Sequence, residues 1–156
     1  MALSLYNIDN FSESHKSDFL EYIRDTRNSC RHRMTRNQDL ITKEEQISWY
    51  KGLDDNTQVF ILIVSEHGVA FFPCGYGLVR YKDDVAILTG AIEESSRGKG
   101  CGRELFKLLI EEAQKVTDKV TLEVFESNVE AFNLYKSLGF EIIDKDDDIV
   151  FMELVK

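Results

Sequence analysis

The residues with the clearest chemical meaning form a glycine-rich turn over residues 97–102, which reads Arg-Gly-Lys-Gly-Cys-Gly. An apolar pattern of helical period follows at once in residues 104–110. The first N–H groups of a helix have no partner within the helix and lie at the positive end of its dipole, so they attract anions. Glycine lets a ligand approach the backbone closely, and Arg97 and Lys99 each add a positive charge. The turn therefore predicts a phosphate-binding site.

Two familiar phosphate loops do not fit this turn. A Walker A loop needs a lysine followed by serine or threonine, and no such pair stands here. A dinucleotide fingerprint that starts at Gly98 needs glycine at its sixth position, where this chain has Arg103. The remaining pattern is Arg97-x-x-Gly100-x-Gly102, which by itself is also explained by an ordinary turn between a strand and a helix.

A second motif follows the first after one helix and one strand. Residues 119–125 alternate in β-branched side chains and predict that strand. Ser127 and Glu130 have the spacing of a capping box, which predicts that the next helix begins there. Gly139 has the place of the left-handed residue that ends this helix. One face of the helix carries Asn128, Ala131, Leu134, Tyr135 and Leu138.

The two motifs together resemble the core of the GNAT superfamily of acyl-CoA-dependent N-acyltransferases. The resemblance covers residues 57–156 well and the first half of the chain loosely. It implies one domain over residues 1–156 with an α/β (mixed α+β) fold, in which about four helices flank a central, mostly antiparallel sheet of six to seven strands. It also implies acetyl-CoA as co-substrate and no metal. The second motif is carried by Glu123, Asn128, Ala131, Tyr135, Gly139 and Phe140.

The resemblance assigns the acid–base chemistry to two residues. Tyr135 stands at the position of the general acid, since a phenol with a pKa of about 10 can protonate a thiolate whose thiol has a pKa of about 8.5. Glu123 is the candidate base, with ordered water as the alternative and Glu93 or Glu94 as second candidates. Packing alone would also explain Tyr135, and contact with solvent or a nearby cation would also explain Glu123.

The same resemblance places the cofactor along the strand that ends at residue 92 and across the glycine turn. Backbone N–H groups at the end of that strand would polarise the thioester carbonyl, as in an oxyanion hole. Cys101 lies within the turn, but no histidine stands in a recognisable relation to it, so a catalytic thiol is not favoured. The residues expected beside acetyl-CoA are Gly90, Ala91, Ile92, Arg97, Gly98, Lys99, Gly100, Cys101, Gly102 and Asn128.

The first half of the chain is expected to bind the acceptor, and its sequence identifies the acceptor less clearly than the second half identifies the cofactor. Residues 31–36 form the only local basic cluster outside the glycine turn, and Thr42 with Glu45 forms a capping box before a helix. This region resembles acetyltransferases that act on amino groups of nucleotide-linked sugars, although Gln46 stands where histidine is expected. Arginine suits a diphosphate, and an aromatic side chain can stack on a ring. A solvated basic loop and a packed helix explain the region equally. The residues expected to bind the acceptor are Arg31, Arg33, Trp49 and Tyr50.

The favoured function is transfer of an acetyl group to a primary amine of a small molecule, by direct attack in a ternary complex. The N-terminal amine of a protein or peptide and a polyamine are alternative acceptors. A non-catalytic acyl-CoA-binding regulatory module is the alternative to an enzyme, as is one half of a complex whose partner supplies the acceptor. Fold alone decides none of these.

The composition fits one globular domain of 156 residues, of which 43% are hydrophobic. The net charge of −9 disfavours nonspecific binding to nucleic acid, which depends on cationic contacts with phosphate. No apolar run is long enough to span a membrane, and no signal peptide is evident. The three cysteines lack a CxxC spacing, which favours reduced thiols in the cytoplasm over a disulfide framework or a zinc site. A homodimer is considered as the assembly.

Hydrophobic periodicity predicts the remaining elements. A turn is expected at His67–Gly68, a hairpin turn at Asp144–Asp148, and Pro73 is expected in a loop or at a sheet edge. The expected strands cover residues 3–8, 58–65, 75–82, 85–92, 119–125, 140–143 and 149–155. The expected helices cover residues 12–27 and 42–53, the segment after the glycine turn, and the segment that carries Tyr135.

Overall fold

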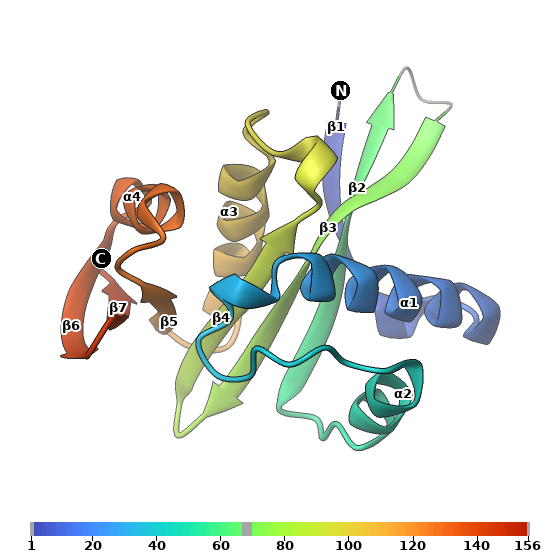
Figure 1. Cartoon of the computed structure of the whole chain (residues 1–156), viewed down its shortest axis with the longest axis horizontal. Helices are drawn as coiled ribbons and strands as arrows, with labels where there is room; N and C mark the ends of the chain where they lie inside the picture. Colours follow the sequence, from blue (N-terminus) through green and yellow to red (C-terminus); the bar gives the residue numbers. More distant parts are fainter. Residues whose placement is uncertain (1, 67–69, 156) are drawn as a thin grey trace.

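The protein is built on one sheet with helices on both faces. The structure is a computed structural model and describes residues 2–66 and 70–155. Seven strands form the sheet in the order β1-β2-β3-β4-β5-β7-β6 (Figure 1). The strands are β1 (Ala2–Asn7), β2 (Thr57–Glu66), β3 (Ala70–Lys82), β4 (Val85–Ile92), β5 (Lys119–Phe125), β6 (Phe140–Asp146) and β7 (Ile149–Leu154). The helices are α1 (Glu13–Ser29), α2 (Lys43–Lys51), α3 (Cys101–Gln114) and α4 (Val129–Ser137). The predicted fold class is confirmed.

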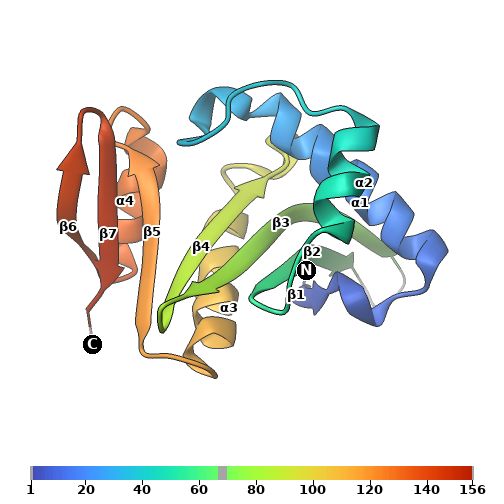
Figure 2. The same ribbon diagram turned by 90° about the horizontal axis from the view of Figure 1, so that it is seen from below.

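The sheet is antiparallel except where β4 meets β5. These two strands are parallel because α3 carries the chain back across the sheet between them. Their pairing begins at Val85 with Lys119 and ends at Leu88 with Leu122. Both strands continue beyond that point, so their backbones separate and the sheet opens between them (Figure 2). This opening positions the site described below.

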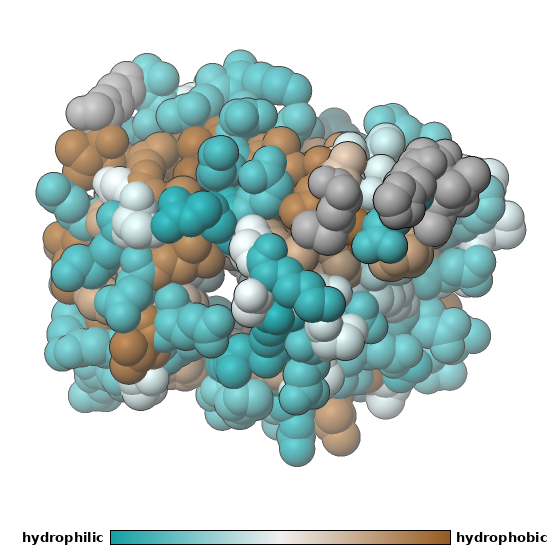
Figure 3. Space-filling view, turned by 90° about the horizontal axis from the view of Figure 1, so that it is seen from above, coloured by the Kyte–Doolittle hydropathy of each residue, from teal (hydrophilic) through white to brown (hydrophobic). Residues whose placement is uncertain are grey.

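Two hydrophobic cores pack on opposite faces of the sheet. Side chains alternate between the faces along a strand, so neighbouring residues of β3 contribute to different cores. Tyr76 packs against α1, whereas Val79 belongs to the larger core beneath α3. Figure 2 shows α1 and α2 together on one face, with α3 on the other. The face seen in Figure 3 carries mainly hydrophilic side chains, with hydrophobic ones between them.

The helix termini confirm one predicted capping box and correct the other. At α2, Thr42 accepts a hydrogen bond from the Glu45 backbone and the Glu45 carboxylate accepts one from the Thr42 backbone, as predicted. The capping box predicted for Ser127 is wrong, because α4 begins one residue later with Asn128 at its N-cap. The Ser127 hydroxyl instead bonds the Asp148 carboxylate at 2.6 Å, so the β6–β7 turn has taken the group that was expected to cap the helix.

Two other expectations concern irregular positions. The acidic hairpin turn is shorter than predicted, because β6 continues to Asp146 and only Asp147 and Asp148 separate it from β7. Pro73 lies inside β3 opposite Ile63, at a point that β4 does not reach among the described residues, so a proline N is tolerated there. The turn predicted at His67–Gly68 lies outside the described residues.

None of the helices in the described ranges is long and apolar enough to cross a membrane.

Candidate active site

A cavity of about 760 Å³ occupies the opening between β4 and β5 and extends along one face of the sheet. Its floor consists of alternate residues of neighbouring strands, which share a face because of the period of two. Its roof is the segment of residues 30–41 between α1 and α2, and α2 closes one end (Figure 2). The other end reaches the start of α3 and one side of α4. The floor residues from β3 and β4 are Tyr76, Leu78, Arg80, Ile87, Thr89 and Ala91.

The glycine turn forms the α3 end of this cavity. Gly98 and Gly100 have φ values of 75° and 81°, a left-handed conformation that strains any residue with a Cβ. A Cβ at either position would meet nothing within 4 Å, so the turn needs glycine for its backbone conformation and leaves open space beside it. Arg97 donates from Nε to the carbonyl of Ile92 at 3.2 Å, which ties the turn to the end of β4.

The residues predicted to hold the cofactor divide into two groups. Seven of them line the cavity, and three of the turn do not. Cys101 is buried at the first position of α3, and Lys99 and Gly100 are exposed. The seven that line the cavity are Gly90, Ala91, Ile92, Arg97, Gly98, Gly102 and Asn128.

Tyr135 lies on the wall of the cavity that α4 provides. Its ring packs edge-to-face on Phe106 at 4.8 Å and on Phe140 at 6.1 Å between centroids, and the residue is 8% exposed. No described residue hydrogen-bonds its hydroxyl, although the residue borders the open space. Burial raises the pKa of Tyr135 well above its ordinary value, so the phenol keeps its proton at neutral pH.

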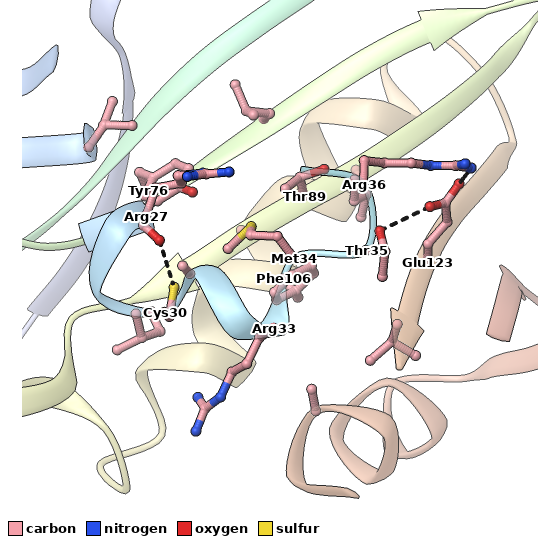
Figure 4. Close-up of a pocket in the computed structure, with 18 of the residues that line it drawn as sticks. Arg27, Cys30, Arg33, Met34, Thr35, Arg36, Tyr76, Thr89, Phe106 and Glu123 are labelled. Atoms are coloured by element: carbon pink, nitrogen blue, oxygen red, sulfur yellow. Dashed lines mark hydrogen bonds and ion pairs between the residues drawn. The ribbon is translucent and has the colours of Figure 1, made fainter. Parts of the chain in front are cut away.

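Glu123 lies on β5, one residue beyond the last pair with β4. Thr35 donates from Oγ1 to Glu123 Oε2 at 3.1 Å, and the Arg36 guanidinium bonds Oε1 (Figure 4). Both carboxylate oxygens of the candidate base are therefore held by the roof. Both partners belong to the basic cluster of residues 31–36, but no local pattern assigns them this role, because 88 and 87 residues separate them from Glu123. The second candidates, Glu93 and Glu94, do not line this cavity.

The four residues predicted to bind the acceptor are not all brought together. Arg33 and Trp49 line the cavity, and Figure 4 shows the Arg33 side chain pointing away from Glu123. Arg31 is exposed and donates to the carbonyl of Gln38 at 3.3 Å. The Tyr50 hydroxyl donates to the Asp9 carboxylate outside the cavity. Neighbouring residues of a helix point about 100° apart, and on α2 Trp49 lines the cavity whereas Tyr50 does not. The roles of all four stay predictions.

Two polar residues at the end of α1, the buried Arg27 and the half-buried Asn28, hold the roof in place. Arg27 is 8% exposed and donates to the backbone carbonyls of Asn37 and Asp39. Asn28 exchanges two hydrogen bonds of 3.0 Å with the backbone of Ile41. Apart from one turn of 3-10 helix at Arg31–Arg33, this segment has no regular element, so these side-chain hydrogen bonds fix its conformation. Arg27 stands four residues after the buried Ile23, so it shares the inward face of α1, and this spacing is the signal in the sequence that could reveal its role.

The cysteines and acidic residues give no further reactive centre. Cys30, Cys74 and Cys101 are free and buried. Burial raises the pKa of Cys74 to about 12 and also raises that of Cys30. Among the described residues, no group of three or more His, Cys, Asp or Glu side chains could hold a metal ion.

Comparisons with known proteins agree with this geometry. The model of the acetyltransferase (GNAT) family matches residues 11–140. A search of curated proteins finds no match. A domain from Methanocaldococcus jannaschii has a TM-score of 0.81 at 17% identity, covering 98% of this chain and 97% of its own.

Two solved acetyltransferases share the fold. The spermidine N-acetyltransferase of Vibrio cholerae, in complex with CoA and spermine, has a TM-score of 0.76 at 16% identity and covers 97% and 92% of the two chains. The Campylobacter jejuni N-acetyltransferase PseH, in complex with acetyl coenzyme A, has a TM-score of 0.69 at 19% identity and covers 99% of each.

Proposed function

Because the chain belongs to the GNAT acetyltransferase family, we propose that it transfers the acetyl group of acetyl-CoA to a primary amine by direct attack in a ternary complex. The observation that carries the proposal is the continuity of one cavity. The same space borders the Arg97–Gly102 turn, the Tyr135 ring, Glu123 and the roof between α1 and α2. A cofactor and an acceptor can therefore meet without a covalent enzyme intermediate.

The residues of the cavity can account for each proton in this reaction. Glu123, directly or through water, takes a proton from the acceptor's ammonium group. The freed amine attacks the thioester carbonyl carbon, the C–S bond breaks, and the departing thiolate takes a proton from Tyr135. The nitrogen of the new amide then loses its second proton, which passes through solvent to the Tyr135 phenolate, and solvent removes the proton from Glu123. Beyond Leu88 the edge of β4 that faces β5 has no strand partner there, so the backbone N–H groups on that edge can polarise the carbonyl oxygen, while the alternate N–H groups pair with β3.

The raised pKa of Tyr135 defines what kind of acid it can be. Burial makes the phenol a weaker acid, so full proton transfer to a solvated thiolate would be unfavourable. The same dry environment also raises the pKa of the CoA thiol, which brings the two groups closer together in proton affinity. Tyr135 therefore acts first as a hydrogen-bond donor to the sulfur. This hydrogen bond strengthens as negative charge develops on the sulfur, and the proton is then transferred to the thiolate within the cavity.

For the acceptor we propose a small-molecule amine, with a nucleotide-linked aminosugar as the first candidate. Two residues that line the cavity support it, because the guanidinium of Arg33 suits phosphate and the exposed ring of Trp49 suits stacking on a base or sugar. A polyamine and a peptide N-terminus are the competing acceptors, because Glu123 would attract any ammonium group. Location in the cytoplasm belongs to the same proposal, and the three buried free thiols support it.

A panel assay tests this function. Release of free CoA thiol is followed with aminosugar nucleotides, polyamines and short peptides, using Tyr135→Phe as the matched inactive control. The proposal predicts release with at least one amine class and mass-spectrometric detection of the N-acetyl product. Absence of thiol release from every class, together with no acetyl-CoA binding at millimolar concentration, would overturn it and favour a non-catalytic module with another ligand.

A further inference from the structure

The ion pair that crosses the cavity is strongly asymmetric. The Glu123 side chain is 18% exposed, whereas the Arg36 side chain is 71% exposed. The carboxylate has therefore lost most of its water, and the guanidinium has kept most of its own. Removing the partner of a desolvated charge is costly, whereas an exposed cation loses little when it leaves. Glu123 needs a cationic partner, but that partner need not be Arg36.

The backbone of the roof is fixed on either side of the contact, so only a side chain has to move. Residue 37 is held by buried Arg27 through its carbonyl, and Thr35 holds the second carboxylate oxygen of Glu123. The long Arg36 side chain lies between these anchors and reaches across to β5 (Figure 4). Rotation of Arg36 into solvent would release Glu123 Oε1 and leave the carboxylate oriented by Thr35.

We propose that Arg36 is a specificity-determining residue that occupies the cation position on Glu123 until the ammonium group of an acceptor replaces it. The catalytic consequence rests on the proposed function, whereas the exchange itself is a binding property of the cavity. An ammonium group restores the charge pair that Arg36 gave up. A neutral hydroxyl of the same shape does not, so the exchange selects amines over alcohols.

The exchange also favours the forward direction of the reaction cycle, from binding of the amine to release of the product. The incoming ammonium is placed against the carboxylate that would take its proton. The N-acetyl product is a neutral amide and cannot pair with Glu123. Arg36 then returns to the carboxylate, which favours release of the product over its retention.

The experiment measures binding of n-butylammonium and of its neutral analogue 1-butanol, with no acetyl transfer required. Amide resonances of Thr35 and Glu123 are followed by two-dimensional ¹⁵N NMR at neutral pH in wild type, Arg36→Gln and Arg36→Lys. Lys145→Gln is the matched control, because Lys145 forms an exposed ion pair with Glu126 that does not line the cavity.

We expect Arg36→Gln to bind n-butylammonium about two- to fivefold more tightly than wild type. This factor corresponds to the free energy that an exposed ion pair contributes, which the ammonium no longer has to overcome. Arg36→Lys should return toward the wild-type affinity, and Lys145→Gln should equal wild type. Binding of 1-butanol should be the same in all four proteins. Glu123→Gln should abolish the preference for the ammonium over the alcohol.

Two further results keep the test decisive. In wild type alone, n-butylammonium should shift the Arg36 side-chain Nε–H resonance toward that of a free arginine, so no variant has to fold for this readout. Equal or weaker binding of n-butylammonium to Arg36→Gln, or an unmoved Arg36 resonance at saturation, would overturn the exchange. Failure of the acetyl-transfer panel with a positive exchange result would instead overturn the proposed function and leave the exchange in place.

Discussion

The two ends of the cavity are built in different ways. The end at α3 is made by backbone: left-handed glycines, a helix start and a strand edge that lacks a partner. The end beneath the roof is made by side chains, with Arg27 and Asn28 fixing carbonyls and Glu123 bridging to Thr35 and Arg36. A backbone site serves a ligand that never changes, and a side-chain site can be altered by single substitutions. This difference suits a constant acetyl-CoA and a particular acceptor.

The largest effect should come from Tyr135→Phe, which keeps the ring and its packing on Phe106 but removes the proton donor. A general acid contributes roughly 10²- to 10⁴-fold, so kcat should fall by that factor with acetyl-CoA affinity unchanged. Because burial raises the tyrosine pKa, wild-type kcat should show no loss from its ionisation up to about pH 10. Pre-steady-state rates measure the chemical step, and an equal rate in the variant would assign Tyr135 to packing alone.

A smaller effect is expected for Gly98→Ala, which tests the backbone end, since Gly98 lines the cavity with a φ of 75°. A left-handed residue with a Cβ costs about 1–2 kcal/mol, so the turn should relax away from its cavity-lining conformation and acetyl-CoA affinity measured by calorimetry should fall about 5- to 30-fold. Gly139→Ala is the control, since Gly139 also has a positive φ of 105° but follows α4 outside the cavity. It should lower the melting temperature and leave affinity intact. Loss of stability alone in both variants would contradict a phosphate site at the turn.

Arg27→Met tests the side-chain end and should have a smaller effect than the glycine substitution. The substitution removes the bonds to Asn37 and Asp39, so the roof loosens and the acceptor KM should rise about three- to tenfold. Acetyl-CoA affinity should stay within error. Arg24→Met, on the same helix but not lining the cavity, is the control. A rise in the KM for acetyl-CoA that equals the rise for the acceptor would show that the two ends are not separable.

The smallest effect concerns the thiols. Burial raises the pKa of Cys74 to about 12, so its thiolate is scarce at ordinary pH and no attacking group is exposed. Treatment of the native protein with iodoacetamide near pH 8 should leave Cys74 unmodified and activity unchanged, with the unfolded protein as the positive control. Rapid alkylation of Cys74 in the native state, detected by peptide mass spectrometry, would show that this part of the core opens easily.

The contrast between the two ends also explains what the sequence could predict. The turn of residues 97–102, the strand before Tyr135 and the glycine after α4 are local patterns, and each was found from spacing alone. The pairing of Arg36 with Glu123 joins residues 87 positions apart, which no local pattern reports. The capping box predicted at Ser127 is wrong for the same reason, since the hydroxyl's actual partner, Asp148, belongs to a distant turn. The sequence offers both Trp49 and Tyr50 as candidates for stacking, and only the folded helix shows that Trp49 lines the cavity whereas Tyr50 does not.

Direct attack requires acetyl-CoA and an amine to occupy the cavity together. Initial rates measured with acetyl-CoA varied at several fixed concentrations of an active amine test this most directly. A ternary complex predicts intersecting lines in the double-reciprocal plot, and incubation with acetyl-CoA alone should leave the mass of the protein unchanged. Parallel lines, with an acetylated enzyme detected in the absence of amine, would contradict the account.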